Sequence, residues 1–234
     1  MNTITLNGVS SMTIKGLLIS SLPPISKPLM RTQVEEIDGR DGDIITPLGY
    51  AAYDKEISIG LYGEFDIDRV ISFFASSGKV IFSNEPDKFY NYTITSQIDF
   101  ERLLRFRTAT VTFHVQPYKY SAIQQSLIFG NLTNESQINV INTGNTDAKP
   151  TLTIYGSGDI ALYLDGVQIF DIALASEEYI TIDIAALEAF KGNTLKNRLV
   201  TGDFDNFSLK TGSNIISWTG TITEIDVSNY SRWI

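Results

Sequence analysis

The single histidine, His114, is the first residue to test for catalysis, because histidine is the side chain most often used as a general acid or base. It alternates with Phe113 and Val115 in a predicted strand, and the chain contains no cysteine. One histidine cannot form a histidine-rich metal site, and a chain with one histidine and no cysteine offers few residues for a catalytic triad. We expect His114 to be a strand residue with an ordinary hydrogen bond.

Paired carboxylates are the second possible source of chemistry, because two of them across a cleft can hydrolyse a glycosidic bond. The candidate pairs are Glu177 and Glu178, Asp203 and Asp205, and Glu224 and Asp226. Adjacent strand residues point to opposite faces, which separates the first pair, whereas residues two apart share a face. The other pairs therefore stay geometrically possible, but they lie among turn residues, where aspartate is favoured for local hydrogen bonding. We expect no catalytic residue and no hydrolase activity.

The acidic run DGRDGD at residues 38–43 superficially resembles a calcium loop. It lacks the Asp-x-Asp-x-Asp-Gly spacing and the later glutamate of an EF-hand. Two Asp-Gly pairs instead suit a tight turn, because glycine adopts positive φ at little cost. The sequence therefore predicts no metal site and no cofactor.

Five aromatic residues could form a platform on which sugar rings stack. They are Tyr155, Tyr163, Tyr179, Trp218 and Trp233. In a β-sandwich, aromatic side chains more often pack in the core or at a sheet edge. Trp218 shares a strand face with Ile216, so we expect it to be buried and the second half of the chain to bind free sugars weakly or not at all.

The composition is that of an ordinary globular protein, with 43% hydrophobic and 19% charged residues in a chain of 234. The N-terminal residues lack the basic stretch and apolar core of a signal peptide, and no apolar run has the length of a membrane-spanning helix. The net charge of −9 argues against a nucleic-acid partner. We therefore expect neither a nucleic-acid nor a membrane partner.

The charge is unevenly distributed along the chain. Residues 1–121 carry 12 Lys and Arg against 14 Asp and Glu, whereas residues 122–234 carry 6 against 13. A nearly neutral first part suits a surface that packs against copies of itself, and the acidic second part is suited to facing water.

The first part of the chain is predicted to contain strands and one amphipathic helix. Alternating residues predict strands at 3–6, 12–19, 31–37, 43–46, 53–62, 79–83, 89–100 and 107–115. Asn7-Gly8 is a turn signal, and residues 22–29 form a proline-rich connecting segment. The helix is predicted at 66–77, with Asp66 as its N-cap and Gly78 closing it. Pro117 should end the last of these strands or confine it to a sheet edge.

The second part is predicted to be an antiparallel β-sandwich. Short strands are expected near 126–129, 137–142, 151–155, 160–164, 167–172, 179–184, 196–200, 214–218 and 221–227. Asp165-Gly166 is a strong hairpin signal, and residues 185–190 are the one stretch that could form a helical turn. The change in composition predicts two domains, residues 1–122 and 123–234, joined around 121–125.

Three segments resemble the distal tail proteins of long-tailed bacteriophages. In the first part, EEIDGRDGDI (35–44), the strand after it, the helix at 66–77 and the closing VQPYKY resemble the ring-forming domain of that family. In the second part, NTGNTDAKPTLTIYGSG resembles the beginning of the family's galectin-like sandwich, with Asn142 and Gly144 leading into Pro150.

Further along, SLKTGSNIISWTG and the closing SRWI resemble the same family. The matching positions are Leu209, Gly212, Asn214, Ile216 and Trp218. The chain departs from the pattern at Lys210 and Thr211, where many relatives have a proline.

The resemblance implies a structural hub in the virion, at the tip of a siphophage tail, made in the cytoplasm of the host bacterium. Six copies would form a ring through the first domain, alone or back to back with a second ring. One face of the ring would join the tail tube, and the other would join the tail-associated lysin or a tail fibre protein. No inserted carbohydrate-binding module fits between the predicted strands, so a separate receptor-binding protein would dock on the ring. The alternative from another class is a carbohydrate-binding virion protein that contacts the host cell wall.

Overall fold

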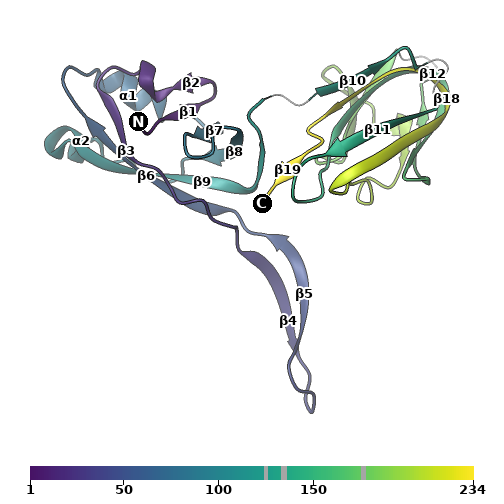
Figure 1. Ribbon diagram of the computed structural model, residues 1–234, viewed down its shortest axis with the longest axis horizontal. Helices are drawn as coiled ribbons and strands as arrows, with labels where there is room; N and C mark the ends of the chain where they lie inside the picture. Colours follow the sequence, from purple (N-terminus) through teal and green to yellow (C-terminus); the bar gives the residue numbers. More distant parts are fainter. Residues whose placement is uncertain (124–125, 133–135, 175–177) are drawn as a thin grey trace. The chain divides into compact units, whose positions relative to one another are not determined.

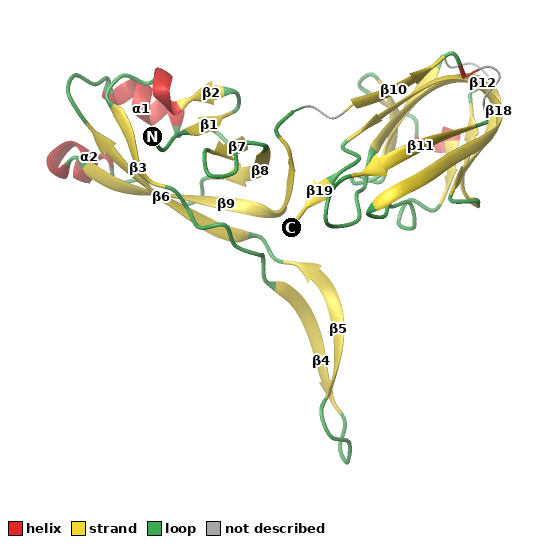
Figure 2. Cartoon of the chain, viewed as in Figure 1, coloured by secondary structure: helices red, strands yellow, loops and turns green. Residues whose placement is uncertain are grey.

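The computed structural model describes residues 1–123, 126–132, 136–174 and 178–234. They form two compact units, Met1–Ala122 with Ile234, and Ile123–Trp233, and each unit has its own hydrophobic core. Strands dominate both units (Figure 2), and the paired strands run antiparallel. The predicted mainly β fold class is therefore confirmed.

The first unit is built on one antiparallel sheet with strand order β2-β1-β7-β8-β9-β6-β3 (Figure 1). Its strands are β1 (Ile4–Leu6), β2 (Val9–Ser10), β3 (Leu17–Ser21), β6 (Tyr53–Leu61), β7 (Gly78–Phe82), β8 (Lys88–Thr93) and β9 (Thr108–Ser121). Two further strands, β4 (Met30–Glu36) and β5 (Asp43–Tyr50), pair only with each other. Asn7 and Gly8 both have positive φ between β1 and β2, so the turn predicted from this pair is confirmed.

The described part of the first unit has two α-helices, where the sequence predicted one. The predicted helix is α1 (Ile67–Phe73), and the Asp66 carboxylate caps it by accepting from two backbone N–H groups. It ends before the predicted boundary, and Gly78 begins β7 with a φ of +142° instead of closing the helix. The end of the strand predicted at 89–100 is wrong, because α2 (Phe100–Phe106) starts there under an Asp99 cap.

The strand predicted at 12–19 is also wrong in its first half. Residues Ser11–Thr13 form a 3-10 turn, η1, because the side chain of Ser10 accepts from the Met12 N–H and holds the chain in a bend. Gly16 follows with a φ of +77°, and a Cβ there would lie 2.5 Å from the Cβ of Phe65. The strand can therefore start only at Leu17.

Pro117 does not end the strand in which it lies. β9 continues to Ser121, and its pairing with β8 shifts register between Tyr90 and Tyr92, so that extra residues of β9 bulge at the proline. On the other side, β6 pairs with β9 only as far as Val115. The missing N–H of Pro117 thus falls outside regular pairing, which is how a strand tolerates proline.

The second unit consists of antiparallel strands that enclose an aliphatic core. They are β10 (Ser126–Gly130), β11 (Gln137–Asn142), β12 (Thr151–Leu164), β13 (Val167–Ala173), β14 (Tyr179–Asp183), β15 (Glu188–Lys191), β16 (Thr194–Leu195), β17 (Val200–Gly202) and β18 (Gly212–Ser228). The short strand β19 (Arg232–Trp233) follows them and is not part of their sheet. A short 3-10 turn, η3 (Asn197–Leu199), replaces most of the strand predicted at 196–200. Residues 185–190 form a turn and β15, so the helical turn predicted there is wrong.

Four of the predicted short strands are in fact two long ones, β12 and β18. The first part of β12 pairs with β14, and its last part pairs with β13, while β18 pairs with β11 and then with β10. These two strands pair with each other, and their register shifts between Tyr155 and Gly156 and again between Ser157 and Ala161. A Cβ on Gly156 would lie 2.3 Å from the Thr221 carbonyl oxygen, and one on Gly220 would lie 2.4 Å from that of Asp159. Glycine therefore allows two strands to serve both layers of the unit.

Trp218 tests the packing of this core. Its side chain is 5% exposed and Ile216, on the same face of β18, is fully buried, so the predicted burial is confirmed. We expect Trp218→Ala to lower the free energy of unfolding by about 3–5 kcal/mol, because it removes a large buried side chain and leaves a cavity. Chemical denaturation followed by circular dichroism measures the change. The control is Ile215→Ala, on the exposed face of β18; a similar loss in both variants would contradict the packing described.

Candidate functional site

A two-stranded ribbon leaves the first unit between β3 and β6 and is the part of that unit least buried by its own fold (Figure 1). We call residues 30–50, which comprise β4, β5 and their turn, the arm. Every residue of β4 is exposed, and the arm's exposed apolar side chains are Met30, Val34, Ile37, Ile45 and Leu48. An isolated two-stranded hairpin is marginally stable in water. The arm is therefore suited to binding a partner surface.

The turn of the arm is formed by the acidic run DGRDGD. Gly39 and Gly42 have φ of +81° and +77°, and the Arg40 N–H donates to the Ile37 carbonyl oxygen. The predicted tight turn is confirmed. In the described part of the chain, no group of three or more His, Cys, Asp or Glu side chains is arranged to hold a metal ion.

The register of β4 and β5 places one apolar pair and one acidic pair of side chains on the same face of the arm. Val34 lies opposite Ile45, and Glu36 lies opposite Asp43. Directly opposed like charges destabilise a strand pair, and no ion pair between described residues includes either carboxylate. This face of the arm thus presents an exposed apolar pair beside an anionic pair that lacks a cation.

The base of the arm is held by hydrogen bonds to the backbone of the proline-rich segment 22–29. Lys55 Nζ donates to the Pro24 carbonyl oxygen at 2.9 Å, and Asn84 Nδ2 donates to that of Pro23 at 2.8 Å. The Ala51 N–H closes the segment by donating to the Leu29 carbonyl oxygen at 2.8 Å. These contacts fix where the chain leaves the sheet to form the arm.

The lysine that holds this segment belongs to a buried charged cluster, which we call the base cluster. Lys119 Nζ lies 2.9 Å from Glu85 Oε1, and the Tyr90 hydroxyl donates to Glu85 Oε2 at 2.5 Å. Lys55 is only 3% exposed, and its Nζ lies 4.9 Å from the centre of the Tyr90 ring. Burial lowers the pKa of Lys55, and nearby Glu85 acts in the opposite direction.

Sequence reasoning missed the base cluster, although one signal was present. Lys55 occupies an inward position in the alternation of β6, between Tyr53 and Ile57 on the core face. A lysine at such a position needs a buried partner. The groups that surround its ammonium, however, are the Pro24 carbonyl oxygen, the Tyr90 ring and Glu85 in the turn before β8, all far from Lys55 along the chain.

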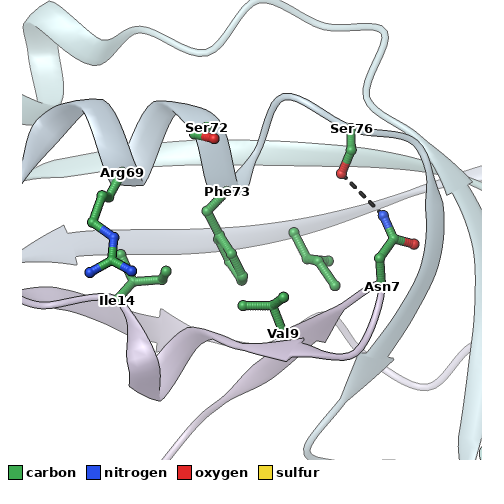
Figure 3. A pocket seen from close by; sticks show the side chains of 8 residues that line it. Asn7, Val9, Ile14, Arg69, Ser72, Phe73 and Ser76 are labelled. Carbon is green, nitrogen blue, oxygen red and sulfur yellow. Dashed lines mark hydrogen bonds between the residues drawn. The ribbon is translucent and has the colours of Figure 1, made fainter.

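A shallow hollow of about 280 Å³ lies between α1 and the β1–β2 turn (Figure 3). Arg69 is at one end, Asn7 at the other, and Phe73 and Val9 lie between them. The Asn7 amide is already used, because it donates to Ser76 Oγ and accepts from the Lys79 N–H. The hollow holds no pair of nucleophile and base and does not indicate catalysis.

The structure places the predicted catalytic candidates apart and in structural roles. His114 Nδ1 lies 2.8 Å from Asp54 Oδ1 on the neighbouring strand, so the expected strand histidine with a hydrogen bond is confirmed. Asp203 accepts from the backbone N–H groups of Asp205 and Asn206 and closes a turn.

The other candidate carboxylates also lie in ordinary strand or loop positions. Asp226 accepts from Ser126 Oγ at 2.5 Å, and Glu224 lies two residues before it in β18. Glu178 precedes β14, and Glu177 lies outside the described residues. The geometry therefore provides no site for acid–base chemistry at these positions among the described residues.

The candidate sugar platform is not assembled as one surface. Trp218 is buried in the core of the second unit. Tyr155 and Tyr179 are opposite each other on β12 and β14, with ring centres 5.2 Å apart, and Lys191 Nζ lies 5.1 Å from the centre of the Tyr179 ring. These two half-buried rings are one aromatic pair of the predicted platform that the structure brings together.

Within the described residues, none of the helices has both the length and the apolar character needed to span a bilayer.

Comparison with protein families identifies the first unit. Residues 13–115 match the family described as the phage tail protein RIFT-related domain. A search of curated protein sequences finds no match.

Comparison with solved structures identifies the fold of the whole chain. The chain is similar to the SPP1 Dit (gp 19.1) protein, described as a paradigm of the hub adsorption apparatus in phages that infect Gram-positive bacteria, with a TM-score of 0.72, 15% identity and 100% of each chain covered. It is also similar to a chain of the phage p2 baseplate in its activated conformation with Sr, with a TM-score of 0.53, 11% identity, and 97% and 96% of the two chains covered. The resemblance to distal tail proteins is confirmed at the level of the fold and of the domain in residues 13–115.

The base cluster makes a prediction about stability. Glu85→Ala leaves Lys119 without its carboxylate in a buried place, and we expect it to lower the free energy of unfolding by about 3–5 kcal/mol. Chemical denaturation measures the loss. Glu64→Ala, which breaks the exposed pair with Lys15, is the control and should cost less than about 1 kcal/mol. Equal effects would show that the cluster is no more important than a surface ion pair.

The buried tyrosines predict loss of stability in alkali. Burial raises the pKa of Tyr53, Tyr90 and Tyr92 above the ordinary 10.0, so the unfolded chain releases these protons first, and stability falls as the pH rises past 10.0. The lowered pKa of Lys55 acts in the opposite direction, but its contribution is complete once the pH exceeds the ordinary 10.5.

The measurement is the slope of the unfolding free energy against pH above 10.5, which should be less steep in Tyr90→Phe than in the parent. Tyr62→Phe, at an exposed side chain, is the control and should keep the parent slope. A Tyr90→Phe slope as steep as the parent's would refute this account.

Proposed function

We propose that this protein, whose residues 13–115 match a phage tail domain and whose fold is that of SPP1 Dit, is a structural hub of a siphophage tail tip. It acts in the virion after synthesis in the cytoplasm of the host bacterium. Its role is to hold other proteins together and not to catalyse a reaction. The arrangement of His114, Asp203 and Asp226 supports this view, because each of these side chains makes a local or cross-strand hydrogen bond.

The hub is a ring of six copies that contact one another through the first unit, as a single ring or as two rings back to back. The arm is the observation that carries this proposal. It exposes apolar side chains on a ribbon that meets the rest of its own unit at its base, where the Tyr50 and Tyr118 ring centres are 6.2 Å apart, and repeated copies supply the missing surface. The nearly balanced charge of residues 1–121 supports close packing of identical units.

The ring joins the tail tube on one face and the tail-associated lysin or a tail fibre protein on the other. The second unit is a galectin-like sandwich domain that serves as a packing and docking module, and a receptor-binding protein docks on the assembled hub. Burial of Trp218 supports a packing role over sugar recognition, because an aromatic side chain must be exposed to stack on a sugar.

Shortening the arm tests the ring. We expect replacement of residues 33–46 by Asn-Gly to leave the first unit folded, because Thr32 and Pro47 still pair and Asn-Gly suits a two-residue hairpin turn. The same change should abolish ring assembly, since the exposed ribbon is lost.

Electron microscopy of tail tips that carry the parent or the shortened chain measures the outcome, and circular dichroism confirms folding. Parent tips without a six-fold ring would refute the proposed hub. A complete ring built from the shortened chain would instead show that the arm is dispensable.

A further inference from the structure

The arm and helix α2 lie at opposite ends of the β6–β9 strand pair. Tyr53, which follows the arm, pairs with Val115, whereas Gly60 pairs with Thr108, just after α2. At about 3.3 Å per residue, the length of β6 separates these ends by roughly 25 Å. The arm also extends away from the sheet (Figure 1) and is not seated on its own helix.

Helix α2 exposes a basic and apolar face. Arg102, Arg105 and Phe106 are three and four residues apart, so they lie on one side of the helix. Phe106 is 65% exposed, and a hollow of about 490 Å³ along this side is lined by these three residues together with Asp99 and Glu101. No ion pair between described residues includes either arginine.

The helix is placed in this way for local reasons. Leu103, on an adjoining side of α2, is fully buried and attaches the helix to the core. Asp99 accepts from the Arg102 N–H at 2.7 Å, so its carboxylate caps the helix. Arg107 ends the helix in the left-handed conformation. The basic face is therefore a rigid surface and not a mobile loop.

The faces of the arm and the helix are complementary in charge and spacing. The arm carries two carboxylates, Glu36 and Asp43, beside the apolar pair of Val34 and Ile45, which are 53% and 61% exposed. The helix carries two guanidinium groups beside Phe106. Val34 and Glu36 are about 6.6 Å apart along a strand, and residues four apart are about 6 Å apart along a helix.

We propose that this face of the arm docks on the face of α2 formed by Arg102, Arg105 and Phe106 in a second copy of the chain. The proposal rests on the ring proposed above and names the two surfaces that meet in it. The carboxylates pair with the arginines, and Val34 and Ile45 cover Phe106. Because the two surfaces lie at opposite ends of one unit, the contact is head-to-tail, and repetition closes a ring or extends a chain.

Charge reversal with matched controls tests the contact. We expect Glu36→Lys and Arg105→Glu each to weaken self-association on the order of tenfold. Glu35→Lys makes the same charge change on the other face of β4, and Arg69→Glu makes it on α1, so neither should alter association. Sedimentation equilibrium of the full chain at low and high salt measures the constants, and the parent should associate more weakly at high salt.

A mixing experiment separates this contact from a general effect of charge. One variant carries Glu36→Lys with Asp43→Lys, and the other carries Arg102→Glu with Arg105→Glu. Each alone should stay monomeric, whereas the mixture should assemble with the two variants alternating, because every remaining arm–helix contact then joins opposite charges. Recovery of assembly in the mixture supports the proposal.

Three results would overturn it. The parent chain could stay monomeric at high concentration, the matched controls could weaken association as much as the test variants, or the mixture could fail to assemble. Disruption by the arm variant without recovery in the mixture would show that the arm docks on a different surface of the second copy. A six-fold ring in tail tips that persists through both reversals would refute this contact and leave the proposed hub intact, whereas parent tips without a ring would refute both.

Discussion

Two lysines and one glutamate lie away from water beneath the segment that leads into the arm. Lys119 and Glu85 form an ion pair. Lys55 donates a hydrogen bond to the Pro24 carbonyl oxygen, and its ammonium group lies over the face of the Tyr90 ring. A buried charge that loses its partner is costly, so this cluster tolerates little rearrangement. The carbonyl groups that it holds determine where the chain leaves the sheet. The direction of the arm, and every contact the arm makes, depends on that constraint.

In the second unit, two long strands connect the two layers. β12 and β18 each pass from one layer to the other, so the layers are joined covalently as well as by packing. Gly156 and Gly220 lie where the register of this strand pair shifts, and any side chain there would collide with the backbone of the partner strand. The core that results is made of aliphatic residues and the buried Trp218. Such a unit is a closely packed support.

The distribution of exposed groups agrees with a protein that works by assembly. In the first unit the arm and α2 each expose apolar side chains beside charged ones, and they lie at opposite ends of one strand pair. An enzyme would instead gather perturbed titratable groups in a concave pocket. Here the groups with a shifted pKa are mainly tyrosines and a lysine at the base of the arm, where they stabilise the fold.

The sequence alone determined the features that depend on a few neighbouring residues. The turns at Asn7-Gly8 and Asp165-Gly166, the Asp66 cap and the burial of Trp218 follow from local backbone preference and from alternation, and the structure confirms them. Only the tertiary structure decided the course of β9 through Pro117, the union of short strands into β12 and β18, and the partners of Lys55. These depend on residues far apart in the chain, whose meeting is set by packing. The anionic face of the arm could not be predicted for the same reason, because its two acidic residues become neighbours only when β4 and β5 pair in register.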